Sequence, residues 1–222
     1  MSIAYRVKRQ QRKSLAVHIL DDASVEVRAP KWLAETEIEA FVLQRKAWIN
    51  AQQEKKQQWL EAKPGYTAGQ LHPYFGETYP LVIAPAKRRR VDFTGKAIEI
   101  ALSEPKDELA VQQLLNVWYR QQAQDCFQKR LSFYLPRLPL STKSPSLKLR
   151  TMKRRWGSCS SRGVITLNTE LIKYPIEAID YVIMHELCHL LEMNHSAAFY
   201  RLLENLCPDY KQREALLSGD AY

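Results

Sequence analysis

Three histidines and a glutamate near the C-terminal end of the chain have a spacing suited to metal chemistry. His185 and His189 are four residues apart, so on a helix both imidazoles project from one face, one turn apart. Two such imidazoles can bind one zinc ion, and Glu186 between them can act as a general base on a zinc-bound water. His195 follows six residues after His189, which leaves enough chain for a turn to bring a third nitrogen to the metal. Three protein ligands and an open position are typical of a catalytic zinc site, because structural sites usually close all four positions.

The residues around the motif predict a buried helix that positions these side chains. Apolar residues surround the histidines in the sequence. Ile179, Val182 and Ile183 precede His185, Leu187 lies between the two histidines, and Leu190 and Leu191 follow His189. Pro175 suits the first turn of this helix, and Ser196 can cap the helix that follows. The alternative is an ordinary core helix, which would require a separate partner for each buried histidine.

The rest of the chain predicts an α+β protein. Alternating apolar residues predict two or three strands over residues 3–29, with the basic run at 8–13 forming a hairpin loop. Residues 30–62 have helical spacing, as one long helix or two with a break near Asn50, and we expect its tryptophans in the core. Strands are predicted within 71–102, at 147–151 and at 164–168, and a second long helix over 105–134. We therefore expect an N-terminal α+β region at 1–104 and a catalytic domain at 105–222.

Composition and charge limit the class of protein. The 222 residues are 45% hydrophobic and contain no apolar run long enough to cross a membrane, so no membrane partner is expected. The N-terminus lacks an apolar signal core, and the four scattered cysteines are expected to be free thiols, which together indicate a cytoplasmic protein. The net charge of +9 permits binding to nucleic acid, nucleotides or acidic proteins, although a solvated basic face is the commoner explanation of such a charge.

Several segments in one order resemble a known family. They are M-K-R-R-W-G-S-C at 152–159, I-T-L-N at 165–168, the histidine motif within 179–190, and N-H-S at 194–196 followed by Phe199. Together they resemble the YgjP-like metallopeptidases. The resemblance implies a zincin-like catalytic domain behind an N-terminal α+β region, with a small sheet beside the active-site helix. It also implies that His185, His189 and His195 bind zinc and that Glu186 is the catalytic acid/base.

The third ligand has an alternative in Glu192. The spacing of the first and third histidines is similar to that of the metzincins, but Glu192 stands where those proteins have a glycine, and no methionine turn is evident. Glycine at that position permits a positive φ, so we expect the turn to pass instead through Asn194, which tolerates this conformation better than Glu192 does. Glu192 itself could bind the metal, because an acid supplies the third ligand in other zincins.

A zinc-dependent peptidase is the first functional hypothesis. Zinc would polarise the water and the scissile carbonyl, and Glu186 would move the proton to the leaving amine. In zincins an edge strand beside the metal pairs with the extended substrate, so either residues 164–168 or the turn at 156–158 could bind a peptide. On this reading Arg155, Trp156, Gly157 and Ser158 are the candidate substrate contacts. We expect Asp180 to be a residue of the helix N-terminus.

Two other functions remain open from the sequence. The same centre could hydrolyse a nucleoside triphosphate to release pyrophosphate, because five cations near the turn could hold the phosphates: Lys148, Arg150, Lys153, Arg154 and Arg155. No glycine-rich phosphate loop accompanies them. The third hypothesis is a DNA-associated protease whose basic N-terminal region docks on nucleic acid.

Overall fold

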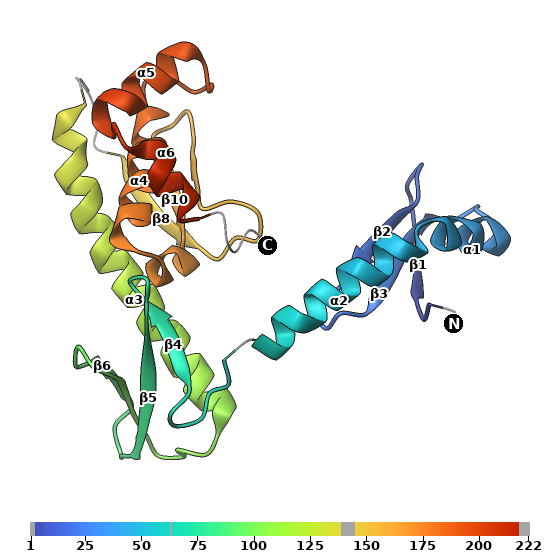
Figure 1. Ribbon diagram of the computed structural model, residues 1–222, viewed down its shortest axis with the longest axis horizontal. Coiled ribbons are helices and arrows are strands. Elements are labelled where there is room, and N and C mark those ends of the chain that lie inside the picture. The colour runs from blue at the N-terminus through green and yellow to red at the C-terminus, as the bar shows by residue number, and fades with distance from the viewer. Residues whose placement is uncertain (1–2, 63, 139–144, 218–222) are drawn as a thin grey trace. The chain divides into compact units, whose positions relative to one another are not determined.

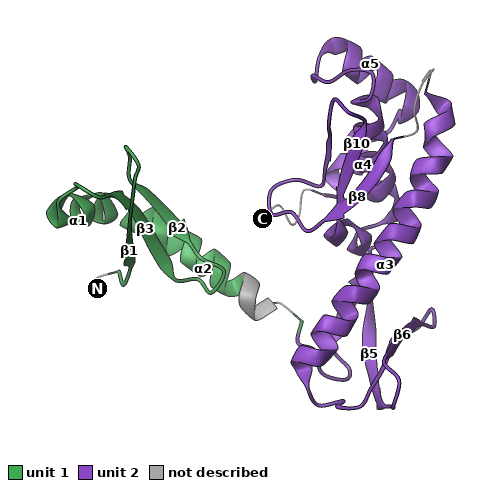
Figure 2. Ribbon diagram, turned by 180° about the vertical axis from the view of Figure 1, so that it is seen from behind, with its two compact units in different colours: residues 1–64 green, residues 65–222 purple. Residues whose placement is uncertain are grey.

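The computed structural model describes residues 3–62, 64–138 and 145–217. Contacts within the chain divide it into two compact units, residues 1–64 and residues 65–222 (Figure 2). The fold is mixed α+β, as predicted from the sequence. None of the described helices is both long and apolar enough to span a membrane.

The first unit is a three-stranded sheet followed by two helices. Its strands are β1 (Arg6–Gln10), β2 (Ala16–Ile19) and β3 (Val25–Pro30), in the order β1-β3-β2. The helices are α1 (Glu35–Gln44) and α2 (Lys46–Ala62), so the predicted break near Asn50 lies at Arg45. Val27 and Ala29 of β3 pack with Ile38 and Ile49 of the helices to form the core of this unit.

Two expectations for this unit were wrong. The basic run does not form a hairpin loop, because β1 continues through Gln10 and pairs in parallel with the central strand β3, which separates it from β2. The tryptophans are also not core residues, since Trp32 is 74% and Trp48 50% exposed. Smaller aliphatic side chains on the inner helix faces already fill this core. The side chain of Trp59 lies outside the described residues.

The second unit begins with a four-stranded sheet. Its strands are β4 (Leu71–Tyr74), β5 (Glu77–Pro85), β6 (Arg90–Phe93) and β7 (Ile98–Leu102), in the order β4-β5-β7-β6. A tight turn at Phe75 and Gly76, both with positive φ, joins β4 to β5. The amides of Phe75 and Gly76 donate to the carbonyls of Ile172 (3.1 Å) and Lys173 (3.0 Å), which attaches this hairpin to the segment before the histidine helix.

The long helix α3 (Glu108–Tyr134) connects this sheet to the rest of the unit (Figure 1). The short 3-10 helix η1 (Leu135–Arg137) follows it. A second sheet contains β8 (Ser146–Arg150), β9 (Gly157–Cys159) and β10 (Val164–Asn168), in the order β8-β10-β9. The 3-10 helix η2 (Thr169–Lys173) then leads to three helices: α4 (Ile176–Cys188), α5 (Ala197–Leu206) and α6 (Tyr210–Ala215).

One continuous apolar core runs through the second unit. Ile98 and Ile100 of β7, Leu115 of α3 and Ile179 and Ile183 of α4 all belong to it and are almost completely buried. The domain boundary predicted after residue 104 lies inside this unit, between β7 and α3, whereas the division by contacts falls after residue 64.

Candidate functional site

Helix α4 carries the candidate site and is packed on nearly every side. It contacts α3, α5, α6 and the strands β9 and β10, so its central residues are buried. His185 and Glu186 lie in its last turn, and His189 is its C-terminal cap. Of the apolar residues that flank the motif, those within α4 are buried in the core: Ile179, Val182, Ile183 and Leu187. Leu190 is partly buried and Leu191 is exposed, and both follow the end of the helix.

The three histidines of the motif converge. Nε2 of His185 and Nε2 of His195 are 3.0 Å apart, and one ligand atom from each of the three residues lies within 4.8 Å of the others. Two nitrogens bound to one tetrahedral zinc at about 2.0–2.1 Å would be about 3.3 Å apart. Phe199 of α5 packs against all three rings, with centroid distances of 5.0, 4.6 and 4.8 Å. These donors therefore fit a zinc ion.

Burial keeps two of these imidazoles in the form that binds metals. Desolvation, followed by the nearby charges of His189 and His195, lowers the pKa of His185 to about 4. Desolvation likewise lowers the pKa of His189. Nδ1 of His189 lies 2.9 Å from the carbonyl oxygen of Glu192, which leaves Nε2 for a metal. A neutral imidazole offers the lone pair that a metal requires.

The turn between His189 and His195 is built differently from the expectation. Among the described residues the non-glycine positions with positive φ are Ala23 and Phe75, so Asn194 does not adopt the left-handed conformation. Instead the end of α4 tightens, as the amides of Leu190 and Leu191 bond to carbonyls three residues earlier. Ser196 caps α5, since its Oγ accepts from the amide of Phe199 at 3.3 Å.

Glu192 contributes to this region through its backbone. Its carbonyl faces His189, and its amide donates to the carbonyl of Cys188 at 2.9 Å. In the described part of the chain, the group of side chains that could hold a metal ion consists of His185, His189 and His195. The Glu192 carboxylate is not part of that group.

Glu186 is buried without a full set of partners. The residue is 4% exposed, and among the described residues its Oε2 has no hydrogen-bond partner. Burial raises the pKa of Glu186 to about 8, and the positive charge of Arg155 opposes this shift. A carboxyl group with a raised pKa and a free oxygen is suited to accept and release a proton near neutral pH.

The residues at 155–158 do not all face Glu186. Gly157 is paired with Leu167 of β10 and lies against the Glu186 side chain. Ser158 is paired with Thr166, so its side chain points to the opposite face of the sheet. Trp156 packs edge-on against Tyr174 at 4.7 Å. Of these four candidate contacts, Gly157 touches Glu186 and Arg155 acts on it through its charge.

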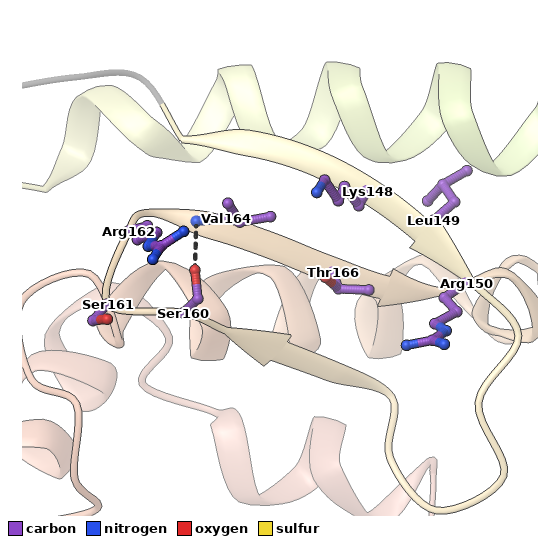
Figure 3. Close-up of a pocket in the computed structure, with 8 residues that line it drawn as sticks. All are labelled: Lys148, Leu149, Arg150, Ser160, Ser161, Arg162, Val164 and Thr166. Atoms are coloured by element: carbon purple, nitrogen blue, oxygen red, sulfur yellow. Dashed lines mark hydrogen bonds between the residues drawn. The ribbon is translucent and has the colours of Figure 1, made fainter.

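The opposite face of this sheet carries a separate basic hollow of about 670 Å³ (Figure 3). Its lining residues come from β8, β10 and the turn after β9: Lys148, Leu149, Arg150, Ser160, Ser161, Arg162, Val164 and Thr166. Lys148 is paired with Thr166, whose side chain alternates with the buried Ile165 and Leu167. The cations proposed to hold a triphosphate are therefore divided, with Lys148 and Arg150 on the face away from Glu186.

Asn168 is a buried residue whose importance the sequence analysis did not identify. Its Oδ1 accepts from the amides of Met152 and Glu170 at 3.2 Å each, and its Nδ2 donates to the carbonyls of Met152 (2.8 Å) and Arg155 (3.2 Å). It thereby holds the loop that crosses from β8 to β9 over the end of β10. Two signals in the sequence pointed to Asn168: it ends a predicted strand shortly before the histidine helix, and it belongs to the I-T-L-N segment that carries the family resemblance.

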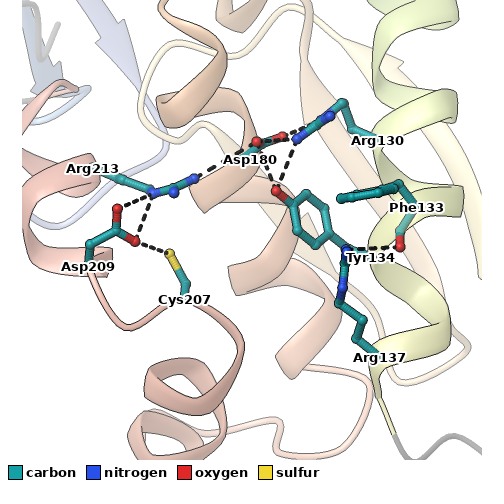
Figure 4. Close-up of polar contacts among 8 residues, drawn as sticks. All are labelled: Arg130, Phe133, Tyr134, Arg137, Asp180, Cys207, Asp209 and Arg213. Carbon is teal, nitrogen blue, oxygen red and sulfur yellow. Dashed lines mark hydrogen bonds and ion pairs between the residues drawn. The ribbon is translucent and has the colours of Figure 1, made fainter.

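Asp180 is the second buried carboxylate of α4, and it is fully engaged (Figure 4). Arg130 of α3 donates to both of its oxygens, through Nε at 2.5 Å and through Nη2, and the Tyr134 hydroxyl donates at 2.9 Å. Arg213 of α6 lies 3.8 Å away and also binds Asp209. Asp180 lies in the N-terminal half of α4, and its side chain links α4 to α3 and α6.

Comparisons with known proteins identify a family for this chain. The sequence matches the family described as "YgjP-like, metallopeptidase domain" over residues 13–219. No match was found among curated proteins. Two similar solved structures are zymogens of metallopeptidases, abylysin of Pyrococcus abyssi and jannalysin of Methanocaldococcus jannaschii. The first is 24% identical, covers 43% of this chain and 90% of its own, and has a TM-score of 0.35. The second is 23% identical, covers 41% of this chain and 92% of its own, and has a TM-score of 0.37.

Proposed function

Because the chain belongs to the YgjP-like metallopeptidase family, we propose that it is a zinc-dependent peptidase with Glu186 as its general base. The observation that carries this proposal is the convergence of three imidazoles next to a buried carboxyl that has a free oxygen. His185, His189 and His195 would hold the metal. A zinc ion bound there would polarise water and a peptide carbonyl.

The proposed role of Glu186 is proton transfer. Its Oε2 accepts the proton of the attacking water and afterwards delivers that proton to the amine of the departing peptide. Burial supports the first step, since a carboxylate whose pKa is raised to about 8 is a stronger base than one at its ordinary value. Arg155 prevents the pKa from rising further.

The proposed substrate is an extended peptide that pairs with β9. Strand β10 is bonded on both sides, by β8 and by β9, so residues 164–168 do not form an edge strand. In the described part of the chain, β9 is an edge of this sheet, and Gly157 brings it next to Glu186. A peptide added to this edge would gain backbone hydrogen bonds and pass beside the carboxylate.

The test is a hydrolysis screen with purified, zinc-loaded protein. We expect cleavage of unstructured peptides, a loss of about 10²- to 10⁴-fold in kcat for Glu186→Gln, and unchanged zinc content in that variant. Nucleoside triphosphates and single- and double-stranded DNA serve as the comparison ligands. Full peptide hydrolysis by the Glu186→Gln protein would refute the mechanism, and Glu186-dependent pyrophosphate release alone would replace the peptidase with a nucleotide hydrolase.

The third ligand needs its own pair of variants. We expect His195→Ala to lose most of the bound zinc and Glu192→Ala to retain it, because the three imidazoles form the cluster and Glu192 offers only its carbonyl to His189. Zinc content measured by elemental analysis after dialysis gives the answer. The reverse pattern would assign the third ligand to Glu192.

A further inference from the structure

Gly157 lies where any larger residue would meet the Glu186 side chain. A Cβ atom at this position would be 2.7 Å from Cγ and 2.8 Å from Cδ of Glu186, and it would meet Oε1 as well. Carbon atoms in proteins pack at about 3.5–4.0 Å. The carboxylate therefore occupies the space that a side chain on β9 would take.

The glycine is needed for space and not for backbone freedom. The glycines with positive φ in the described chain are Gly69, Gly76, Gly95 and Gly163, and Gly157 is not one of them. Alanine can adopt the backbone conformation at 157, so its methyl group would be the whole of the perturbation.

The backbone of β9 is hydrogen-bonded to β10, so it cannot easily move away from Glu186. Gly157 is paired with Leu167, which is completely buried, and the amide of Asn168 donates to the carbonyl of Trp156 at 2.8 Å. Asn168 also binds the carbonyl of Arg155 through Nδ2. With the strand fixed, the Glu186 side chain is the part that has to move.

We propose that Gly157 is a positioning residue, which keeps the Glu186 carboxylate in place beside the histidines by leaving its own Cβ position empty. The catalytic meaning of this contact rests on the proposed function, whereas the contact itself does not. Gly157 would act through Glu186 and need not touch the substrate or the metal.

The first test is a double-mutant cycle on the thermal stability of the full-length, metal-free chain. Gly157→Ala should lower Tm by several degrees in the wild type and in Glu186→Gln, which keeps the same side-chain shape. In Glu186→Ala, which removes Cγ, Cδ and both oxygens, the same change should have almost no effect. An equal drop of Tm in all three backgrounds would overturn the proposal.

The second test separates positioning from folding. We expect Gly157→Ala to lower kcat about 10²-fold with KM changed by no more than a few-fold, since a misplacement of about 1 Å can have that effect. The visible spectrum of the cobalt-substituted protein should be unchanged, because the histidines are not disturbed. Full kcat in Gly157→Ala would overturn the proposal.

Gly65→Ala is the matched control. Gly65 also has no positive φ, and a Cβ there would lie 3.8 Å from the Gln70 side chain, at ordinary contact distance. We expect no change in Tm or kcat for this variant. If the wild type cleaves no peptide, the proposed function fails, but the stability cycle still decides whether Gly157 and Glu186 are coupled.

Discussion

Helix α4 carries two buried acidic side chains, and they differ in their hydrogen-bond and ion-pair partners. Asp180 and Glu186 are each 4% exposed. Asp180 accepts hydrogen bonds from Arg130 and Tyr134 and faces Arg213 as well. In the described chain Glu186 has no partner for Oε2 and is instead packed against Gly157.

This difference indicates that the Asp180 carboxylate has a structural role, whereas the Glu186 carboxyl is suited to proton transfer. Paired and hydrogen-bonded, the Asp180 carboxylate links three helices, and losing one partner would leave buried charge uncompensated. Glu186 has been removed from water without such compensation, which is why its pKa is raised to about 8. Unsatisfied buried polar groups are rare in proteins and are typical of sites where a substrate or an ion completes the set.

Asp180→Asn should give the largest loss of stability. The change leaves two guanidinium groups facing a neutral amide, and breaking a buried pair in this way costs about 3–5 kcal/mol. Because the side chains of Arg130 and Arg213 are 30% and 23% exposed, we expect the lower end, about 3 kcal/mol, measured by urea unfolding.

Asp209→Asn is the control for this prediction. It removes a carboxylate bound to the same Arg213, but the Asp209 side chain is 44% exposed, so its effect should be much smaller. Equal losses for the two variants would mean that burial does not distinguish the Asp180 network.

Asn168→Ala is expected to have the next largest effect, about 2–3 kcal/mol. The change deletes four hydrogen bonds and leaves the carbonyls of Met152 and Arg155 without their donor. Thr151→Val nearby removes one hydroxyl contact, at 2.9 Å to Thr169, and should cost about 1 kcal/mol. The comparison fails if the two variants unfold at the same urea concentration.

Local spacing explains what could be predicted of the site from the sequence. His185 and His189 face one direction because helix geometry alone places residues four apart on one side. The third histidine followed from a short turn, although the φ angle expected at Asn194 was wrong. These features depend on neighbours in the chain, so the sequence pattern is sufficient to find them.

The partners of Asp180 and Gly157 depend on distant elements. Arg130 precedes Asp180 by 50 residues, and the pairing of Gly157 with Leu167 is set by a sheet whose strand order cannot be read from alternation. In the same way β1 alternates like a hairpin strand, yet it pairs in parallel with β3. The apolar pattern predicts much of the aliphatic core, although it failed for Trp32 and Trp48, and it does not predict which buried polar groups meet.

His72 is an intermediate case, with one backbone partner. Its Nε2 lies 2.9 Å from the carbonyl oxygen of Gly65, and burial, with a smaller contribution from the charge of Lys173, lowers its pKa from the ordinary 6.5. The folded chain therefore binds this proton less readily than the unfolded chain does. The stability that His72 contributes is present above pH 6.5 and is lost as the pH falls towards the lowered pKa.

The measurement is the free energy of unfolding at a series of pH values for the wild type and His72→Gln. Glutamine can donate to the Gly65 carbonyl but does not titrate in this range. The other buried histidines titrate in both proteins, so the difference between the two curves isolates His72. We expect this difference to change between pH 7 and 5, and parallel curves would contradict the assignment.

Glu186→Gln should have a much smaller effect on stability than Asp180→Asn or Asn168→Ala. It replaces a buried carboxyl that lacks a partner with an amide of the same shape, so we expect the free energy of unfolding of the metal-free protein to change by less than about 1 kcal/mol. Asp180→Asn is the same chemical change six residues earlier on the same helix, with an expected loss of about 3 kcal/mol. A loss of that size in Glu186→Gln would show that the carboxylate is held by a structural partner, and it would remove the distinction between the two acids on which its assignment as the general base depends.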